Sequence, residues 1–377
     1  MTRYVCAPDS FKESLTALQA AEAMAEGIRR ADFKAEIRTI PMADGGEGTA
    51  QTLADATGGV MRTVDVHDPL GRPIAAQYAI LGDGVTAVVE VAQASGLALL
   101  DRAERNPLAT SSYGTGELIR AALNAGVTTI VVGLGGSATN DAGAGLLQAL
   151  GVRLLDHNGH ELNPGGAVLS QLATIDVTQL DPRLRNTTVI AACDVTNPLI
   201  GVNGASAVFG PQKGASSTDV MILDGALGHF AATTKQQFGI DIAHTPGGGA
   251  AGGIGAALLA FLGARFQSGF DVVAHYAQLD DAVRWADVVF TGEGSIDVQT
   301  KFGKTPAGVA KVAKQYSKPV IAIAGHVGKS IGELHSVGID AVFGTAPGAA
   351  DLNELMRNAA TNVSFTAEQV TRLLSLR

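Results

Sequence analysis

Three segments of this chain repeat one local pattern: a short apolar run, then a loop rich in glycine and acidic residues, then small residues at helical spacing. The loops cover residues 43–48, 133–143 and 291–297. Strand, glycine turn and helix in succession are typical of an α/β sheet. Glycine lets backbone N–H groups approach a ligand and a helix start adds positive dipole, so such loops suit phosphate. Neighbouring carboxylates suit hydrated magnesium, and the pattern predicts nucleotide-dependent phosphoryl transfer.

The length of the chain indicates more than one domain. It has 377 residues, whereas a domain usually holds about 100–200. Hydrophobic residues make up 46%, enough for sizeable cores, while aromatic residues make up only 5% and glycine reaches 47. Because small side chains let helices pack closely on sheets, this composition favours α/β layers over an aromatic-rich β-sandwich.

The α/β alternation is interrupted twice. Residues 64–100, and again the stretch from 152 on, contain short β-like runs separated by turn signals typical of antiparallel hairpins. Strands are expected at residues 4–7, 36–41, 64–66, 74–81, 86–91, 129–132, 188–192, 287–290, 319–324 and 341–344. Helices are expected at residues 15–30, 48–56, 115–125, 144–150, 225–238, 252–262, 307–315 and 367–376.

These interruptions predict a flavodoxin-like or Rossmann-like parallel-sheet domain interrupted by a second, mixed α/β domain. The first domain is expected to combine residues 1–63, 104–151 and 286–377, and the inserted domain residues 64–103 and 152–285. Ligands of open α/β sheets bind at the carboxyl ends of the strands. All three glycine loops are therefore expected to converge on one interdomain cleft, with the inserted domain supplying Asp194 from the opposite side.

Charge and hydropathy exclude two classes of partner. The net charge is −9 without a basic stripe, so neither nucleic acid nor an anionic membrane is expected to bind. Residues 1–8 lack the apolar core and cleavage site of a signal peptide, and the apolar stretch 250–264 is shorter than the ~20 residues that span a bilayer. The sequence predicts a cytoplasmic protein with small-molecule partners.

No Walker A loop is present. Residues 303–305 and 328–330 carry the last three residues of that motif, but Val298 and Ile323 stand where its first glycine is required. An ATP site in this chain must therefore be of another type.

A loose dinucleotide fingerprint keeps a second enzyme class open. Residues 247–252 match GxGxxG, and Asp271 lies at about the spacing of a ribose-binding acid. The match is weak, because no convincing strand precedes it and a Gly/Ala-rich run satisfies many patterns by chance. The alternatives are an NAD(P)-dependent dehydrogenase of a small hydroxy acid and a non-catalytic two-domain binding protein.

The third loop has the strongest combination of charges. Glu293 and Asp297 are candidate magnesium ligands, and Lys301 and Lys304 follow closely with the positive charge that phosphate requires. A turn with a helix-capping acid would also explain the two carboxylates.

Other polar residues follow the remaining strands. Lys12 suits a substrate carboxylate or phosphate, although a solvated lysine in a capping turn fits equally. Asp44 and Glu47 flank the glycines of the first loop. Asp194 ends an apolar run, where a carboxylate is either a structural cap or a base.

Five blocks of the sequence resemble those of the bacterial glycerate kinase family, which acts in glycolate, glucarate and allantoin breakdown. They are residues 7–12 (APDSFK), 43–49 (ADGGEGT), 135–143 (GGSATNDAG), 193–199 (CDVTNPL) and 291–297 (TGEGSID). The blocks occur in the right order and extend over essentially the whole chain, so the resemblance is specific.

The resemblance implies ATP-dependent phosphorylation of D-glycerate with magnesium, usually on the 2-hydroxyl to give 2-phosphoglycerate. It also implies two α/β domains, one flavodoxin-like and one inserted, with the site between them. A glycerate 3-kinase that gives 3-phosphoglycerate is the alternative, and the oligomeric state stays open between monomer and homodimer.

The hypotheses for individual residues combine these arguments. Asp194 is the expected base for the acceptor hydroxyl, and Lys12 is expected to orient the glycerate carboxylate. Glu293 and Asp297 are the expected magnesium ligands. The expected substrate-binding residues are Asp9, Ser10, Lys12, Asp44, Gly45, Gly46 and Glu47. The expected ATP-binding residues are Gly135, Gly136, Ser137, Thr139, Asn140, Lys301 and Lys304.

Overall fold

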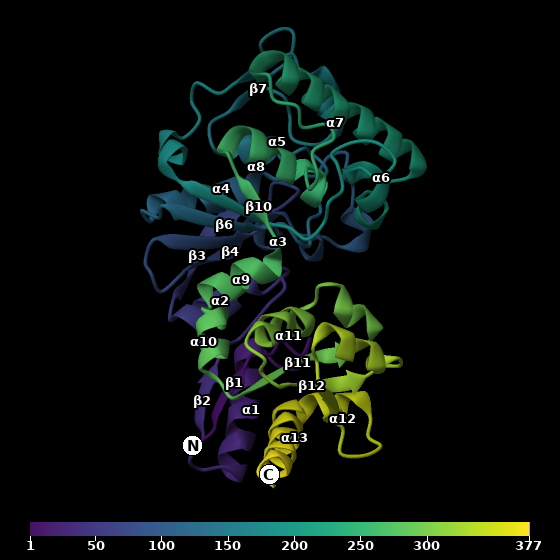
Figure 1. Cartoon of the computed structure of the whole chain (residues 1–377). Coiled ribbons are helices and arrows are strands. Elements are labelled where there is room, and N and C mark those ends of the chain that lie inside the picture. Colours follow the sequence, from purple (N-terminus) through teal and green to yellow (C-terminus); the bar gives the residue numbers. More distant parts are fainter. Residues whose placement is uncertain (377) are drawn as a thin grey trace. The chain divides into compact units, whose positions relative to one another are not determined.

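The computed structural model describes residues 1–376 and divides the chain into two compact units, each built of helices and a central sheet (Figure 1). Unit 1 contains Met1–Asp44, Gln51–Gly58 and the described residues from Phe270 on. Unit 2 contains Gly45–Ala50 and Gly59–Gly269. The predicted α/β class is confirmed.

A parallel five-stranded sheet forms the centre of unit 1. Its order is β13-β12-β11-β1-β2, and every neighbouring pair is parallel. The strands are β1 (Arg3–Cys6), β2 (Glu36–Thr39), β11 (Val288–Ile296), β12 (Val320–Val327) and β13 (Ala341–Gly344). The helices are α1 (Ala17–Ala31), α10 (Leu279–Trp285), η7 (Val298–Phe302), α11 (Thr305–Gln315), η8 (Ile331–Val337), α12 (Leu352–Arg357) and α13 (Ala359–Leu374). Two more helices, α2 (Thr49–Thr57) and α9 (Gly269–Tyr276), begin in unit 2 and continue in unit 1.

Local sequence explains how α1 begins and how it packs. Thr16 caps the helix in a capping box with Gln19, an arrangement that stabilises a helix by about 0.5–2 kcal/mol. Met24 lies on the buried face of α1. A Cβ on Gly27 would lie 2.0 Å from the Ser364 carbonyl oxygen, so glycine permits the close contact between α1 and α13.

A mixed six-stranded sheet forms the centre of unit 2. Its order is β10-β9-β6-β5-β4-β3; the last three strands are antiparallel, whereas β5, β6, β9 and β10 are parallel. The strands are β3 (Val60–His67), β4 (Pro73–Ile80), β5 (Thr86–Glu90), β6 (Thr129–Gly133), β9 (Thr188–Ala192) and β10 (Arg265–Gln267), and β7 (Arg153–Leu155) pairs with β8 (Thr174–Asp176) in a separate hairpin. The α-helices are α3 (Val91–Ser95), α4 (Tyr113–Asn124), α5 (Ala144–Ala149), α6 (Ala205–Phe209), α7 (Ser217–Phe238) and α8 (Ile254–Leu262). The shorter 3₁₀ helices are η1 (Leu97–Leu99), η2 (Arg102–Glu104), η3 (Ala167–Gln171), η4 (Pro182–Asn186), η5 (Pro211–Lys213) and η6 (Ala250–Gly253).

Residues 104–151 belong to unit 2, whereas the sequence placed them in the first domain. β6 pairs with β5 on one side and with β9 on the other. The second glycine loop therefore leaves the unit 2 sheet, so the three loops do not all follow strands of one sheet. Parallel strand–loop–helix segments occur in both units, and such a local pattern does not tell which sheet a parallel strand joins.

The predicted antiparallel stretches are present. β3, β4 and β5 form consecutive antiparallel pairs, and residues 153–176 contain the β7–β8 hairpin. α7 begins at Ser217, earlier than predicted, because Ser216 and Asp219 form a capping box. No helix within residues 1–376 is long and apolar enough to cross a membrane.

Candidate functional site

Asp9 lies directly beyond β1, at the carboxyl edge of the unit 1 sheet. Its N–H donates to the Gly292 carbonyl oxygen at 2.8 Å. The Thr305 hydroxyl, at the start of α11, donates to the Asp9 carboxylate. Burial raises the pKa of Asp9; the Thr305 hydrogen bond lowers it, and the charge of Asp44 raises it further. The first strand thus brings a carboxylate beside the third glycine loop.

Glu293 is the second partly buried carboxylate of this edge, and it lies on β11. Thr300 Oγ1 donates to its Oε1 at 2.8 Å, and Lys304 Nζ lies 3.4 Å from its Oε2. Burial raises the pKa of Glu293. Contacts with Thr300 and Lys304 lower this pKa, and the charge of Asp9 raises it. Asp9 and Glu293 therefore form one acidic cluster with Lys304 as its cation.

The structure separates the two candidate lysines of the third loop. Lys301 pairs with Glu333 on η8, whereas Lys304 faces Glu293. Asp297 caps η7, because its Oδ1 accepts the Gln299 N–H at 2.7 Å. The capping interpretation of Asp297 therefore holds locally, and Lys304 is the lysine directed at the acidic cluster.

Lys12 and Ser10 are exposed in the loop after β1. A Cβ on Gly294 would lie 3.2 Å from the Lys12 backbone nitrogen, so the third loop and the Lys12 segment are in contact. Asp44 is also exposed in unit 1. Unit 1 thus gathers the predicted residues of the first strand with those of the third loop.

The acidic cluster fits a magnesium ion of the kind shared with a substrate. Mg²⁺ is usually held by one or two carboxylates together with waters and phosphate oxygens. No group of three or more His, Cys, Asp or Glu side chains that could hold a metal occurs within residues 1–376. Two neighbouring carboxylates with raised pKa, Asp9 and Glu293, nevertheless suit a dication, which would relieve their repulsion.

The first and second glycine loops meet in unit 2. A Cβ on Gly135 would lie 3.5 Å from Gly46 Cα, and a Cβ on Gly133 would lie 3.5 Å from the Gly45 carbonyl oxygen. Since neither loop carries side chains at these contacts, their backbones lie against each other. The structure therefore brings residues predicted to bind the substrate to those predicted to bind ATP.

Asp194 is connected to the first glycine loop by Gly269. Its Oδ1 accepts the Gly269 N–H at 3.1 Å. Gly45 has a φ of +89°, and a Cβ there would lie 2.4 Å from Gly269 Cα, so only glycine fits. Asp194 is exposed. The exposed Asp194 carboxylate is thus separated from the first glycine loop by a single residue, Gly269.

Most of the second loop is buried rather than open to a ligand. Gly135 and Gly136 are exposed, whereas Ser137 is 6% exposed and Thr139 and Asn140 are 0% exposed. Asn140 Nδ2 donates to Ser206 Oγ at 2.9 Å. The two glycines are therefore the accessible backbone of the loop, and the polar side chains lie beneath it.

A buried lysine, Lys213, supports this loop from η5. It is 1% exposed, and its Nζ donates to Ser137 Oγ at 2.8 Å and to the Thr139 carbonyl oxygen at 2.6 Å. Burial lowers the pKa of Lys213 to about 7, and the charge of Asp141 opposes this shift. The loop is thus held by a cation that is only partly charged at neutral pH.

Asp141 fixes the end of the same loop. It is fully buried and accepts both the N–H and the hydroxyl of Ser112 at 2.8 Å, besides the Gly143 and Gly145 N–H groups at 3.1 and 3.2 Å. Burial raises the pKa of Asp141, and these hydrogen bonds lower it. The loop is therefore fixed to the start of α4 as well as to α5.

Glu90 supports the first loop in a similar way. It ends β5, is 3% exposed, and its Oε1 accepts the Thr49 N–H at 2.9 Å. Burial raises the pKa of Glu90 to about 7, although hydrogen bonds from the Thr49, Gly48 and Ala50 backbone lower it; the charge of Glu47 raises it. Glu90 thus holds the start of α2 to the unit 2 sheet.

Comparison with known proteins identifies the family of the chain. The family model for the glycerate kinase family matches residues 4–375. The chain belongs to the glycerate kinase family. It is therefore an enzyme of the kinase class, and this prediction is confirmed.

Individual members of the family agree with the match. A glycerate kinase from Bacillus subtilis (strain 168) is 50% identical over 374 residues, which cover 99% of this chain and 98% of the relative. A glycerate 2-kinase from Escherichia coli (strain K12) is 48% identical, with the same coverage. A crystal structure from Salmonella typhimurium LT2, assigned as glycerate kinase 2, superposes with a TM-score of 0.92 at 48% identity and covers 100% of this chain and 98% of that chain.

In this glycerate kinase family member, the run 247–252 has a packing role instead of a dinucleotide-binding one. No strand directly precedes it. A Cβ on Gly252 would lie 1.9 Å from the Thr139 carbonyl oxygen, and Gly252 O accepts the Ala142 N–H at 3.0 Å. The strand–turn–helix context that the fingerprint requires is absent from this segment, and the glycines let it lie against the second loop.

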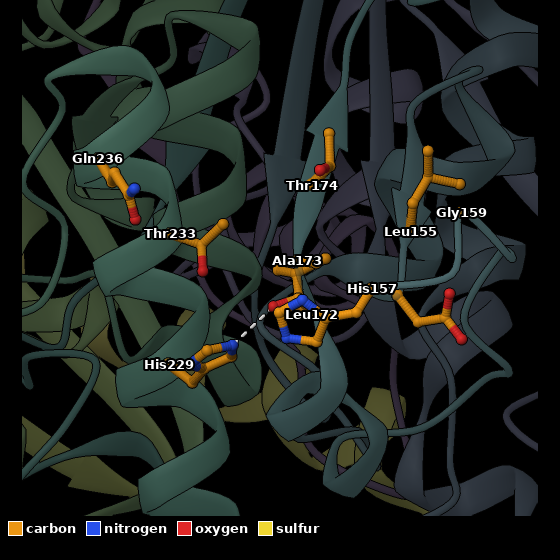
Figure 2. Close-up of a pocket in the computed structure, with 10 residues that line it drawn as sticks. Leu155, His157, Gly159, Leu172, Ala173, Thr174, His229, Thr233 and Gln236 are labelled. Carbon is orange, nitrogen blue, oxygen red and sulfur yellow. Dashed lines mark hydrogen bonds between the residues drawn. The ribbon is translucent and has the colours of Figure 1, made fainter.

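A separate pocket of unit 2 lies between the β7–β8 hairpin and α7 (Figure 2). Its volume is about 520 Å³. Its lining residues include His157, His229 and Thr233, but no predicted site residue. His229 Nε2 lies 2.7 Å from the Leu172 carbonyl oxygen, so one nitrogen of that ring is engaged with the backbone.

No role was predicted from the sequence for Lys213, Glu90 or Thr305. A lysine between glycines in residues 210–214 was the visible signal for Lys213. Glu90 was marked by its place at the end of the apolar run TAVVE. Burial, which gives each residue its role, comes from the tertiary structure.

Proposed function

We propose that the protein transfers the γ-phosphoryl group of ATP to the 2-hydroxyl of D-glycerate, which yields 2-phosphoglycerate and ADP. The support is membership of the glycerate kinase family and 48% identity to a relative named glycerate 2-kinase. The observation that carries the proposal is the meeting of the first loop with the second loop and with the residue that Asp194 holds. Acceptor and phosphate donor would bind at such a junction.

Asp194 is proposed as the general base. Its carboxylate accepts the proton of the 2-hydroxyl while that oxygen forms a bond to the γ-phosphorus and the bond from phosphorus to the β,γ-bridging oxygen breaks. The hydrogen bond from Gly269 fixes one carboxylate oxygen. The exposed position of Asp194 suits contact with a bound substrate.

Glycerate is proposed to bind through its carboxylate to Lys12, whose exposed ammonium can form a charge-assisted hydrogen bond. Ser10 and the backbone of Gly45 and Gly46 are proposed to orient its hydroxyl groups. Asp9, Asp44 and Glu47 complete the proposed substrate set from the sequence.

ATP phosphates are proposed to bind the backbone N–H groups of Gly135 and Gly136, with Lys304 as the lysine of the third loop. Ser137, Thr139 and Asn140 act from beneath as supports of that backbone, since they are buried. Lys301 is proposed to have a minor part, because Glu333 already pairs with it.

Glu293 is the proposed principal magnesium ligand, and Asp297 contributes directly or through water. The bound ion would neutralise phosphate charge. The proposed setting is the cytoplasm, with the protein as monomer or homodimer.

Release of ADP that depends on D-glycerate tests this function. Initial rates should saturate with both D-glycerate and ATP, and Asp194→Asn should lose turnover. ADP release that is indifferent to D-glycerate would contradict the proposal.

A further inference from the structure

Lys213 is unusual because it is a buried lysine that supports the second glycine loop. Lysine is rarely buried completely without a paired carboxylate, because its ammonium loses hydration. The hydrogen-bond acceptors of Lys213 in the described residues are a hydroxyl and a backbone carbonyl, both uncharged. A buried cation of this kind costs stability unless another negative charge compensates it.

Two further atoms indicate that the polar interior of the loop is incomplete. Thr139 Oγ1 and Asn140 Oδ1 are buried, and neither has a hydrogen-bond partner within the described residues. Native proteins satisfy most buried polar atoms, and exceptions point to a missing partner or a functional role. The unpartnered atoms belong to the same loop that Lys213 supports, and they are independent of its charge.

One carboxylate acts on the charge of Lys213. It is Asp141, in the loop itself, whose charge favours the ammonium form. The backbone of Arg105 packs against the end of η5, because a Cβ on Gly214 would lie 2.4 Å from the Arg105 carbonyl oxygen. Arg105 Nε is buried and has no hydrogen-bond partner within the described residues. A bound polyanion would add negative charge to that of Asp141 and so favour the ammonium form of Lys213 further.

We propose that Lys213 is a positioning residue for the ATP phosphates and that it takes up a proton when they bind. Its ammonium fixes Ser137 and Thr139, which turns the exposed Gly135–Gly136 backbone toward the polyphosphate. Lys213 is buried and acts through the loop rather than by contact with ATP. The inference rests on the proposed function, which assigns this loop to ATP.

The direction of proton transfer follows from the burial of Lys213. With a pKa of about 7 the group is only partly protonated near neutral pH. A bound polyphosphate favours the ammonium and raises this pKa, so the protein draws a proton from the buffer. The expected uptake is about 0.5–0.9 proton between pH 7 and pH 8.

Calorimetry in buffers of different ionisation enthalpy measures this proton directly. The full-length protein is titrated with β,γ-methylene ATP and Mg²⁺ at several pH values between 6 and 8.5. Lys213→Met removes the charge with little change in length. The matched control, Lys235→Met, removes an exposed lysine of α7 that pairs with Asp241. Because the analogue ionises identically in each titration, differences between variants report the protein.

When the analogue binds, wild-type protein and the Lys235→Met control should take up about 0.5–0.9 proton more than Lys213→Met does. This difference is the excess proton uptake. Lys213→Met should also weaken binding of the analogue about tenfold at pH 6.5 and leave the KM for D-glycerate unchanged. Lys213→Arg, which keeps a permanent charge, should bind without the excess proton, and it serves as the second variant if Lys213→Met does not fold.

Equal proton uptake and affinity in wild type and Lys213→Met would overturn the inference, as would the absence of excess uptake in the wild type. Either result would leave the proposed function intact if the enzyme still converts D-glycerate. Failure of the wild type to bind the nucleotide at all would instead contradict the proposed function.

Discussion

Both units bury carboxylates beside their glycine loops, but among the described residues a fully buried lysine lies only beneath the second loop, in unit 2. In unit 1, Asp9 and Glu293 are partly buried acids whose pKa values burial raises. In unit 2, Lys213 is a buried base whose pKa burial lowers to about 7. An acidic cluster becomes more stable when a cation binds, and a buried lysine when an anion binds.

This contrast teaches that similar strand–loop–helix segments can serve different ligands. The third loop presents carboxylates with Lys304 beside them, which suits magnesium and the phosphates around it. The second loop presents exposed glycine backbone above a lysine, which suits phosphate alone.

The largest effect is expected for the acid that belongs to neither buried group. Asp194→Asn should lower kcat by about 10²–10⁴-fold with little change in KM, because it removes a general base. Steady-state kinetics with D-glycerate and ATP measures the effect. Asp241→Asn, which alters an exposed acid of the same unit, should leave kcat unchanged. Near-normal turnover of Asp194→Asn would exclude this role.

Glu293→Gln tests whether the acidic cluster of unit 1 binds magnesium. The Mg²⁺ concentration for half-maximal rate should rise about 10–100-fold, because the principal carboxylate ligand is lost. Asp297→Asn should raise it as well, by a smaller factor. Glu333→Gln is the control, since that acid pairs with Lys301 at the surface. If magnesium titrations of the Glu293 and Asp297 variants match the wild type, the metal assignment is wrong.

Lys304 and Lys301, which follow the same glycine loop, should differ in their effect on ATP binding. Lys304→Met should raise the KM for ATP by roughly tenfold, because a charge-assisted phosphate contact is lost. Lys301→Met should change it less than about twofold, as expected for an exposed ion pair. A larger effect of Lys301→Met than of Lys304→Met would reverse the assignment.

The last expected effect concerns stability and not catalysis. The folded-state pKa of Glu90 is raised from 4.5 to about 7. The folded state therefore binds more protons than the unfolded state between these values, so the free energy of unfolding falls as pH rises through this window. Urea unfolding between pH 4.5 and 7.5 should show a flatter slope for Glu90→Gln, by up to about 1.4 kcal/mol per pH unit. An unchanged slope would contradict the raised pKa.

Local chemistry could be predicted from the sequence because it depends on neighbouring residues. The first helix and the loops after β1, β6 and β9 follow from apolar spacing and glycine. The hairpins of β3, β4 and β5 follow from turn signals. The family resemblance rested on the same local blocks and is confirmed.

Properties that depend on distant residues could not be predicted. The sheet to which β6 belongs is decided in part by its pairing with β9, a strand that follows it by more than fifty residues. Lys213 becomes a buried support only because residues 137–139 fold over it. The contact between Gly252 and Thr139 O likewise turned an apparent dinucleotide motif into a packing surface.

Phosphorus NMR of the product formed from D-glycerate and ATP shows directly which hydroxyl receives the phosphoryl group. A phosphate on the 2-hydroxyl is attached to a carbon with one hydrogen, so its proton-coupled signal is a doublet, and ADP signals should appear with it. This is the predicted result. A triplet, which reports attachment to the CH₂ carbon in 3-phosphoglycerate, or a spectrum of unchanged ATP, would contradict the account.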